Sequence, residues 1–203
     1  METLARQRWG GTFHAGMAAA LATCIAAWFG CAALFLPFSL LPFLWAPWIP
    51  SVLVIYICMA PRSLAEHARK VENALRSGNA GEARHSVSMI VGRDTERMDV
   101  YGIARAAIES VAENLTDGVF STLFWASAGC LAGGASGAAS AALAHRVFNI
   151  LDAMWGKKNE RYRHFGTFAA RMDDALNFIP ARLILPCISF SALMVKGTST
   201  RRA

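Results

Sequence analysis

The chain alternates between long uncharged stretches and short stretches dense in charge. The first uncharged stretch, residues 9–61, holds 53 consecutive positions without Asp, Glu, Lys or Arg. This length accommodates two membrane helices of about 20 residues each with a turn between them. Four prolines interleaved with aromatic residues favour that turn, since proline is unsuited to a helix interior. We therefore expect a transmembrane hairpin with spans at 13–36 and about 40–60.

The polar stretch that follows, residues 62–117, has the period of amphipathic helices. Gly78 is a stop signal for the first helix, and Asn79 with Glu82 is a capping pair for a second helix at about 80–91. A third helix is expected at about 99–116, with this apolar stripe: Ile103, Ala107, Val111 and Leu115. Together these patterns predict cytoplasmic amphipathic helices.

Two polar residues break the pattern of the third helix. At 100° per residue, Asn114 lies about 20° and Asp117 about 40° from Ile103, so both are expected to point toward the packed side. The other charged residues of this region lie on the opposite side, as on a solvated face: Arg105, Glu109 and Glu113.

The second uncharged stretch, residues 118–144, is rich in glycine, alanine and serine. Small residues allow close approach of membrane helices. They equally allow a broken, re-entrant segment that lines a cavity. The composition leaves both a full span and a re-entrant segment open.

A polar motif region at 145–182 and a short apolar segment at 183–195 follow. Within the polar region we expect a helix at about 167–179, ended or kinked by proline. Three polar residues are placed opposite its apolar side: Asp173, Asp174 and Asn177. No internal repeat or flexible linker divides the chain, which predicts a single membrane domain over 1–203.

Composition supports an all-α, polytopic helical membrane protein. Hydrophobic residues make up 55% and charged residues 17% of the chain, where soluble domains carry about a quarter charged residues. The net charge of +6 does not indicate nucleic acid binding, because the basic residues flank the apolar segments instead of forming a continuous run. The positive-inside rule places both ends of the hairpin on the cytoplasmic side.

The polar residues outside the apolar segments are mainly carboxylates, amides and arginines. Carboxylate and amide oxygens suit a hard cation such as Mg²⁺ carrying phosphates, and arginine donates bidentate bonds to phosphate or carboxylate. The alternative is a set of solvated helix-face pairs, worth a few tenths of a kcal/mol each. Four histidines show no metal-ligand spacing and are expected at the surface or in helix caps: His67, His85, His145 and His164.

Four motifs, in order, resemble the CobD/CbiB family of cobalamin biosynthesis. They are IVGRDT at 90–95, RAAIESVAENLTDG at 105–118, NILDAMWGKKNERYRHFG at 149–166 and AARMDDALNFIPARL at 169–183. The family members are membrane-bound adenosylcobinamide-phosphate synthases. They join aminopropanol, generally as its O-phosphate, to the free propionate carboxylate of adenosylcobyric acid, forming an amide.

The resemblance implies cofactors, partners and roles for individual residues. It implies an inner-membrane ligase that uses ATP and Mg²⁺, with the corrinoid and aminopropanol phosphate as substrates and the lipid bilayer and other corrinoid-pathway enzymes as partners. The expected catalytic residues are Glu109, Glu113, Asp117 and Asp174, and the expected metal ligands are Asp117, Asp173 and Asp174. The expected substrate- and phosphate-binding residues are Arg93, Asp94, Arg105, Asn114, Asn149, Asp152, Asn159, Glu160, Arg161, Arg171, Asn177 and Arg182.

A single site requires that oxygen ligands from different helices converge. We therefore expect Asn114 and Asp117 to meet the acids and amide of the 167–179 helix. By the same resemblance, the family extends further at both ends, with an HPV-like motif near its beginning and a region beyond IPARL. The alternatives to the enzyme are a non-catalytic membrane sensor or scaffold on the same fold and an inactive, truncated family member.

Overall fold

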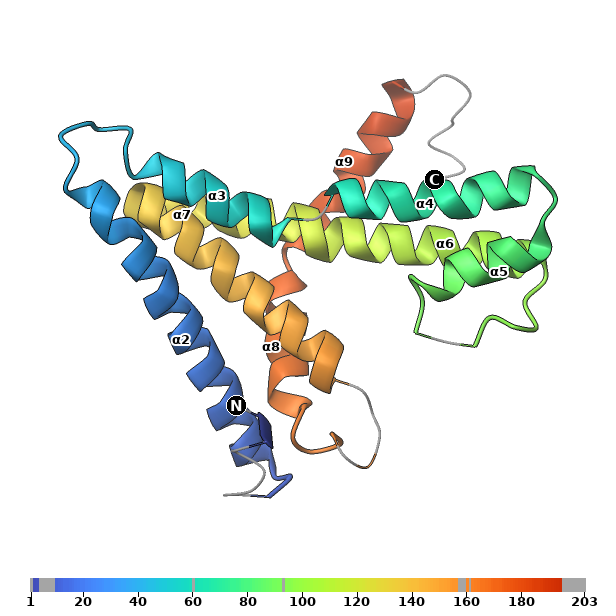
Figure 1. Ribbon diagram of the computed structural model, residues 1–203, viewed down its shortest axis with the longest axis horizontal. Coiled ribbons are helices and arrows are strands. Elements are labelled where there is room, and N and C mark those ends of the chain that lie inside the picture. The colour runs from blue at the N-terminus through green and yellow to red at the C-terminus, as the bar shows by residue number, and fades with distance from the viewer. Residues whose placement is uncertain are drawn as a thin grey trace. The chain divides into compact units, whose positions relative to one another are not determined.

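A computed structural model describes residues 2–3, 10–59, 61–92, 94–156, 160 and 162–194. Every secondary-structure element assigned in these ranges is a helix, as the sequence predicts. The chain divides into two compact units, residues 1–58 with 120–203 and residues 59–119. Figure 1 shows the helices of each unit.

Unit 1 begins with the expected apolar hairpin. Helix α2, Phe13–Ser39, starts at the Thr12 side chain, which accepts a hydrogen bond from the Ala15 backbone N–H. It ends three residues later than expected. Pro37 lies in its last turn, so the helix stops two residues after this proline. The returning helix α3 is shorter than expected, Trp48–Cys58, and the proline-rich residues before it form the turn.

The next long helix, α7 (Ser121–Trp155), answers the question that composition leaves open. Its backbone leaves helical geometry at Gly133 and Gly134, and Gly134 has a φ of 60°. A Cβ atom built on Gly129 would overlap the Gly137 carbonyl, and one on Gly137 would overlap the Gly129 carbonyl. Two arms of α7 therefore fold back on each other through these glycines, as the yellow and orange parts of α7 show in Figure 1. This segment is a helical hairpin.

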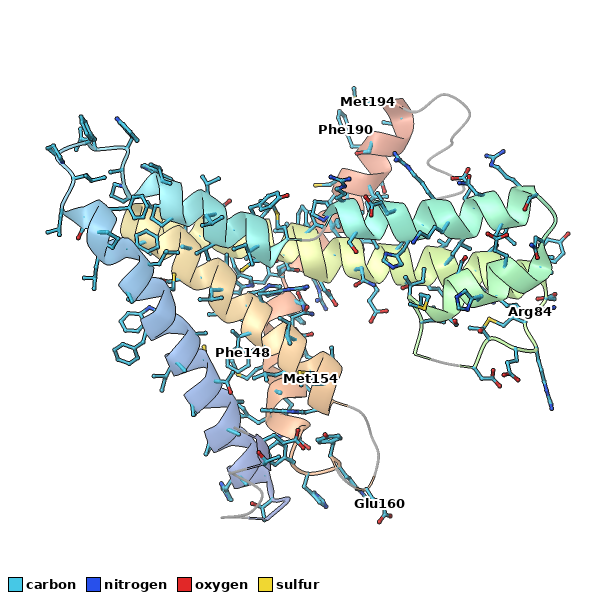
Figure 2. The ribbon with its side chains drawn as sticks, in the orientation of Figure 1. Arg84, Phe148, Met154, Glu160, Phe190 and Met194 are labelled. Atoms are coloured by element: carbon cyan, nitrogen blue, oxygen red, sulfur yellow. The ribbon has the colours of Figure 1, made fainter. Side chains whose placement is uncertain are left out.

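The second arm of α7 also continues beyond the expected end of the apolar segment. It stays helical through Trp155, so the first part of the expected polar region belongs to this helix. Its aromatic side packs with α2 and the loop after α7 around a cluster of Ala15, Phe148, Trp155 and Phe165. Figure 2 shows Phe148 on this arm, on the side of α2.

Two shorter helices complete unit 1. Helix α8, Thr167–Asn177, packs against α7 and α2. Helix α9, Pro180–Met194, begins on a proline. Proline suits the first position of a helix, because the N–H group that it lacks would have no partner within the helix there. Most of its apolar side chains are exposed, among them Phe190 and Met194 in Figure 2.

Unit 2 contains the amphipathic helices that the sequence predicts. They are α4 (Pro61–Arg76), α5 (Ala80–Ser88) and α6 (Val100–Leu115), followed by the π-helical turn η1 (Thr116–Phe120). Gly78 has a φ of 73°, which favours glycine, and Asn79 caps α5 by accepting from the Glu82 N–H. Val71, Val87 and Ile103 form the centre of this unit's core.

By length and apolar composition, three stretches of the described chain are suited to cross a membrane. They are Phe13–Ser39, the stretch Trp48–Arg76 that contains α3 and α4, and the stretch Val100–Trp155 that contains α6, η1 and α7. Their apolar side chains are largely exposed, as expected for lipid contact: Ile25, Phe29, Val52, Tyr56 and Ile57 are all more than half exposed. The protein is therefore an all-α membrane protein.

Candidate functional site

Five polar residues from α7 and α8 form a connected network within unit 1. His145 Nε2 lies 3.0 Å from Asn177 Oδ1, and Asn177 Nδ2 donates to Asp173 Oδ2 over 3.1 Å. On the α7 side, Arg146 donates to Asn149 Oδ1 over 2.8 Å, and Asn149 in turn hydrogen-bonds to Asp173. We call these residues, His145, Arg146, Asn149, Asp173 and Asn177, the α7–α8 polar network.

Three of the five network residues are buried, in contrast to the solvated helix face that the sequence left open for this region. His145 is 1% exposed, Asp173 7% and Asn177 9%. Burial raises the pKa of Asp173, while hydrogen bonds from Asn149 and Asn177 oppose this shift by smaller amounts. Buried polar groups of this kind are retained when they specify structure or bind a ligand.

Two atoms of the network lack a partner among the described residues. They are Nδ1 of His145 and Oδ1 of Asp173, both inaccessible to solvent. The first arm of α7 closes on the same region, because Trp125 Nε1 donates to the backbone oxygen of Leu176 over 3.0 Å. The end of α8 therefore contacts both arms of the α7 hairpin.

A pocket lies where α7 ends and α8 begins. It has a volume of about 470 Å³ and is lined by Gly156, Glu160, Tyr162, Arg163, Gly166, Thr167, Ala170 and Arg171. Arg163 and Arg171 are exposed at this pocket, and we call it the arginine pocket. Two guanidinium groups suit an anionic ligand such as phosphate. Figure 2 labels Glu160, in the loop between the two helices.

The arginine pocket and the polar network share one face of α8. Gly166, Ala170, Asp173 and Asn177 follow one another at steps of four, three and four, which is a single helical stripe. The first two line the pocket, and the last two belong to the network. Gly166 allows the close approach here, because a Cβ atom on it would overlap the Trp155 carbonyl oxygen.

The other expected site residues of unit 1 lie outside the network. Asp174 is exposed, although it follows a buried acid, because successive residues of a helix face different directions. Asp152 is half-buried on α7. Arg182 is exposed, stacks on the Phe178 ring and donates to the Phe178 backbone oxygen over 2.7 Å.

The expected site residues of unit 2 lie at the surface of α6 and the preceding loop. Arg105 and Glu109 form an exposed ion pair of 3.1 Å, and Glu113 is exposed. Asp94 accepts from the Glu96 N–H over 2.9 Å, and Asp117 is half-buried in η1.

The expectation that Asn114 points toward the packed side is wrong. Its side chain is exposed and donates to the Ser110 backbone oxygen over 2.8 Å. The packed stripe of α6 ends at Ser110, which is buried and donates to the Ile90 backbone oxygen. Helical periodicity gives the direction of a residue, but it does not show where along the helix the neighbouring helices stop.

Several expectations stay predictions. Arg93, Asn159 and Arg161 lie outside the described residues. The convergence of Asn114 and Asp117 with the acids of α8 also stays a prediction, since these groups belong to different units. Among the residues that the structure describes, no three His, Cys, Asp or Glu side chains form a group suited to hold a metal ion.

Sequence reasoning missed His145, which was expected at the surface or in a cap. His145 does lack metal-ligand spacing, but that observation does not show whether the side chain is buried. His145, Asn149 and Asp152 recur at steps of four and three on α7, and Asp173 and Asn177 are four apart on α8. Two helices with matching polar stripes would have indicated a shared buried network.

The fold and the network define a helical membrane protein with a polar site enclosed between helices. Over residues 1–202 the chain matches the family described as CobD/Cbib protein. The chain belongs to this family. No solved structure gives a significant match.

Curated relatives bear the name cobalamin biosynthesis protein CobD. The protein of Chromobacterium violaceum is 52% identical over 135 residues, which are 66% of this chain and 41% of the relative. That of Klebsiella pneumoniae is 40% identical over 77% of this chain and 47% of the relative, and that of a Sinorhizobium species is 41% identical over 88% and 52%. The chain thus matches about half the length of these relatives.

Proposed function

We propose that this protein takes part in ATP-dependent amide formation, joining aminopropanol phosphate to the free propionate carboxylate of adenosylcobyric acid. Family membership supports the pathway. The observation that carries the reaction class is the α7–α8 polar network, in which an acid and a histidine are buried with unpartnered acceptor atoms. A membrane protein retains such groups at a cost, and they mark functional sites.

The arginine pocket supports a phosphate-bearing substrate. Arg163 and Arg171 supply guanidinium donors, whereas the hydroxyl groups of Tyr162 and Thr167 in the same lining already donate to Glu2 and to the Arg163 backbone oxygen. Arg171 and Glu160 are the two residues of this pocket that the family resemblance expects in substrate binding. Charge-assisted hydrogen bonds from arginine are about twice as strong as neutral ones, so this pocket would orient a phosphate group.

The acidic residues fit Mg²⁺ that arrives with a nucleotide better than a resident metal centre. Magnesium is usually held by one or two carboxylates together with waters and substrate phosphates. Asp174 offers an exposed carboxylate of this kind, whereas the Asp173 carboxylate is turned into the network. When bound, ATP with Mg²⁺ would supply the activation that a carboxylate needs before an amine can displace an oxygen from it.

The chain's own residues would then handle charge and protons. Amide formation requires that the amine lose its proton before its nitrogen attacks the activated carbonyl carbon. Asp173 and His145 provide acceptor atoms inside a site from which water is excluded, where a positioned base is most effective. The positive-inside rule supports a cytoplasmic position for the polar motifs, in the inner membrane.

Genetic complementation tests this proposal. The host is a strain that lacks its own enzyme for this amidation, and the test protein is a full-length relative in which residues 121–182 of this chain replace the matching segment. We expect growth that depends on cobalamin synthesis, with loss of growth for Asp173→Asn and unchanged growth for Ser127→Ala, an exposed control position on α7 within the transferred segment. Growth of the Asp173→Asn strain at the normal rate would contradict the proposal.

A further inference from the structure

Asn177 lies at the centre of the α7–α8 polar network, with a different partner on each side of its amide. Its Nδ2 is 3.1 Å from Asp173 Oδ2, and its Oδ1 is 3.0 Å from His145 Nε2. All three side chains are at least nine-tenths buried. Water therefore does not determine the directions of these hydrogen bonds, and the three side chains must satisfy one another.

The orientation of the Asn177 amide fixes those directions. Its nitrogen donates to Asp173 Oδ2. The Asn177 oxygen then faces His145 and can only accept, so Nε2 of His145 must carry a proton. In the neutral imidazole ring this leaves Nδ1 as a bare acceptor. The network thus selects one tautomer of His145.

Both unpartnered atoms of the network are therefore hydrogen-bond acceptors. They are His145 Nδ1 and Asp173 Oδ1, and neither bonds to a residue in the described part of the chain. A buried acceptor without a donor is costly. A ligand that supplies N–H donors and a positive charge would satisfy the two atoms and balance the carboxylate.

We propose that His145 and Asp173 bind the protonated primary amine of a substrate. An ammonium group carries three N–H donors and no acceptor. It therefore complements two acceptor atoms, one of which belongs to a carboxylate. Arg146, the neighbouring cation, already donates to Asn149. The inference rests on the proposed function, in which an amine is one substrate, and it gives that substrate's amino group a place and two named partners.

The α8 stripe connects this amine site to the arginine pocket. Ala170 lines the pocket, and Asp173 is three residues further along the same face, about 4.5 Å by helical rise. A small molecule with an amine and an anionic group a few bonds apart would reach both. The arginines would hold the anionic end, and His145 and Asp173 the ammonium end.

Nitrogen-15 NMR of the full chain in lipid nanodiscs, with labelled histidine, tests the proposal. We expect the His145 ring to carry its proton on Nε2 and to have a bare Nδ1. The probes are aminopropanol phosphate and propyl phosphate, which lacks the amine. The first should shift the Nδ1 resonance, and the second should not. A proton on Nδ1 in the free protein, or an equal response to both probes, would overturn the proposal.

Two variants provide a binding readout. His145→Gln keeps a donor for Asn177 and removes the bare ring nitrogen, and Asp173→Asn removes the charge. Each should weaken binding of aminopropanol phosphate by about tenfold or more, as for a lost hydrogen bond to a charged group, and leave propyl phosphate binding unchanged. His85→Gln, at an exposed position of α5, is the matched control. If a variant weakened the binding of both probes equally, His145 and Asp173 would have a structural role only, which would contradict the proposal.

These experiments contain neither ATP nor corrinoid, so they separate the two proposals. If binding here depends on the amine, but a separate assay with ATP and the corrinoid gives no amide, the proposed function is refuted and this site is left intact. Amide formation with no amine-dependent binding at His145 would refute this site alone. The tautomer measurement uses the unaltered chain, so it decides the question even if a variant fails to fold.

Discussion

Asp173 and Asp174 are neighbours in the chain, yet their carboxylates lie in different surroundings. Asp173 is 7% exposed and accepts from Asn177, whereas Asp174 is exposed. The family resemblance expects both at one metal ion. The structure favours a division of roles, because adjacent helical residues point about 100° apart: Asp173 belongs to the buried network, and Asp174 is free to meet a soluble ion.

The buried acid should make stability depend on pH. Burial raises the pKa of Asp173, so the folded protein keeps this proton above the ordinary Asp range near 4, where the unfolded chain has lost it. The free energy of unfolding should therefore fall as pH rises from that range through the raised pKa. Asp173→Asn should flatten this part of the profile, and Asp174→Asn should not.

The measurement is the unfolding midpoint in detergent at a series of pH values, with EDTA present to remove divalent ions. Arg146 and Asp174 are the charged groups that also act on Asp173, and both remain in the Asp173→Asn variant. Identical pH profiles for Asp173→Asn and the unaltered protein would show that this carboxyl does not titrate as its burial requires.

Asp117 gives a second test at the residue scale. It is half-buried in η1, and the family resemblance expects it beside Mg²⁺. Asp117→Asn should preserve membrane insertion. Inserting an acidic residue at the centre of a membrane helix costs about 2.5 to 3.5 kcal/mol, and the cost at the membrane boundary is lower. Mg²⁺-dependent turnover should fall by the equivalent of about 1 to 3 kcal/mol. Unchanged turnover would transfer the catalytic role to Glu113 and Asp174.

Single-residue expectations from the sequence were accurate where local geometry decides the outcome. The Asn79 cap and the Gly78 stop are present as predicted, because both depend only on neighbouring residues. The burial of His145 and the exposure of Asn114 were not predicted. Both depend on which helix packs alongside, and periodicity within one helix carries no information about that.

At the scale of elements, the α7 hairpin depends on glycines at its crossing. Gly129→Ala should lower stability by about 1 to 3 kcal/mol, because its new methyl group would overlap the Gly137 carbonyl. Gly30→Ala, in α2, meets no atom within 4 Å and should be neutral or stabilise by up to about 1 kcal/mol. Thermal unfolding in detergent would compare the two. Equal effects would mean that the arms do not cross at Gly129.

The hairpin also shows why its sequence was ambiguous. Residues 118–144 have the small side chains that both a close-packed span and a re-entrant segment require. What separates the two is the backbone at Gly133 and Gly134, where φ reaches 60°. By contrast, the helices of unit 2 carry caps, stops and apolar stripes, and their positions agree with the sequence prediction within a few residues.

At the scale of the whole molecule, the long apolar helices predict a protein that stays in the membrane. Alkaline carbonate should not extract it. The turn between α4 and α5 should lie in the cytoplasm, because arginines flank the hairpin. Ser77→Cys is exposed there and should react with an impermeant maleimide only from the cytoplasmic side, compared with the unaltered chain as background. Labelling from the opposite side would contradict this topology.

The most direct test of an amide-forming site at the α7–α8 polar network is product formation in isolated membranes. The membranes would contain this chain together with the C-terminal part of a full-length relative, supplied with adenosylcobyric acid, labelled aminopropanol phosphate, ATP and Mg²⁺. We predict ATP-dependent transfer of label into the corrinoid, retained by Glu66→Gln and lost in Asp173→Asn and His145→Gln. Absence of labelled corrinoid with the unaltered chain, or equal labelling in all variants, would contradict it.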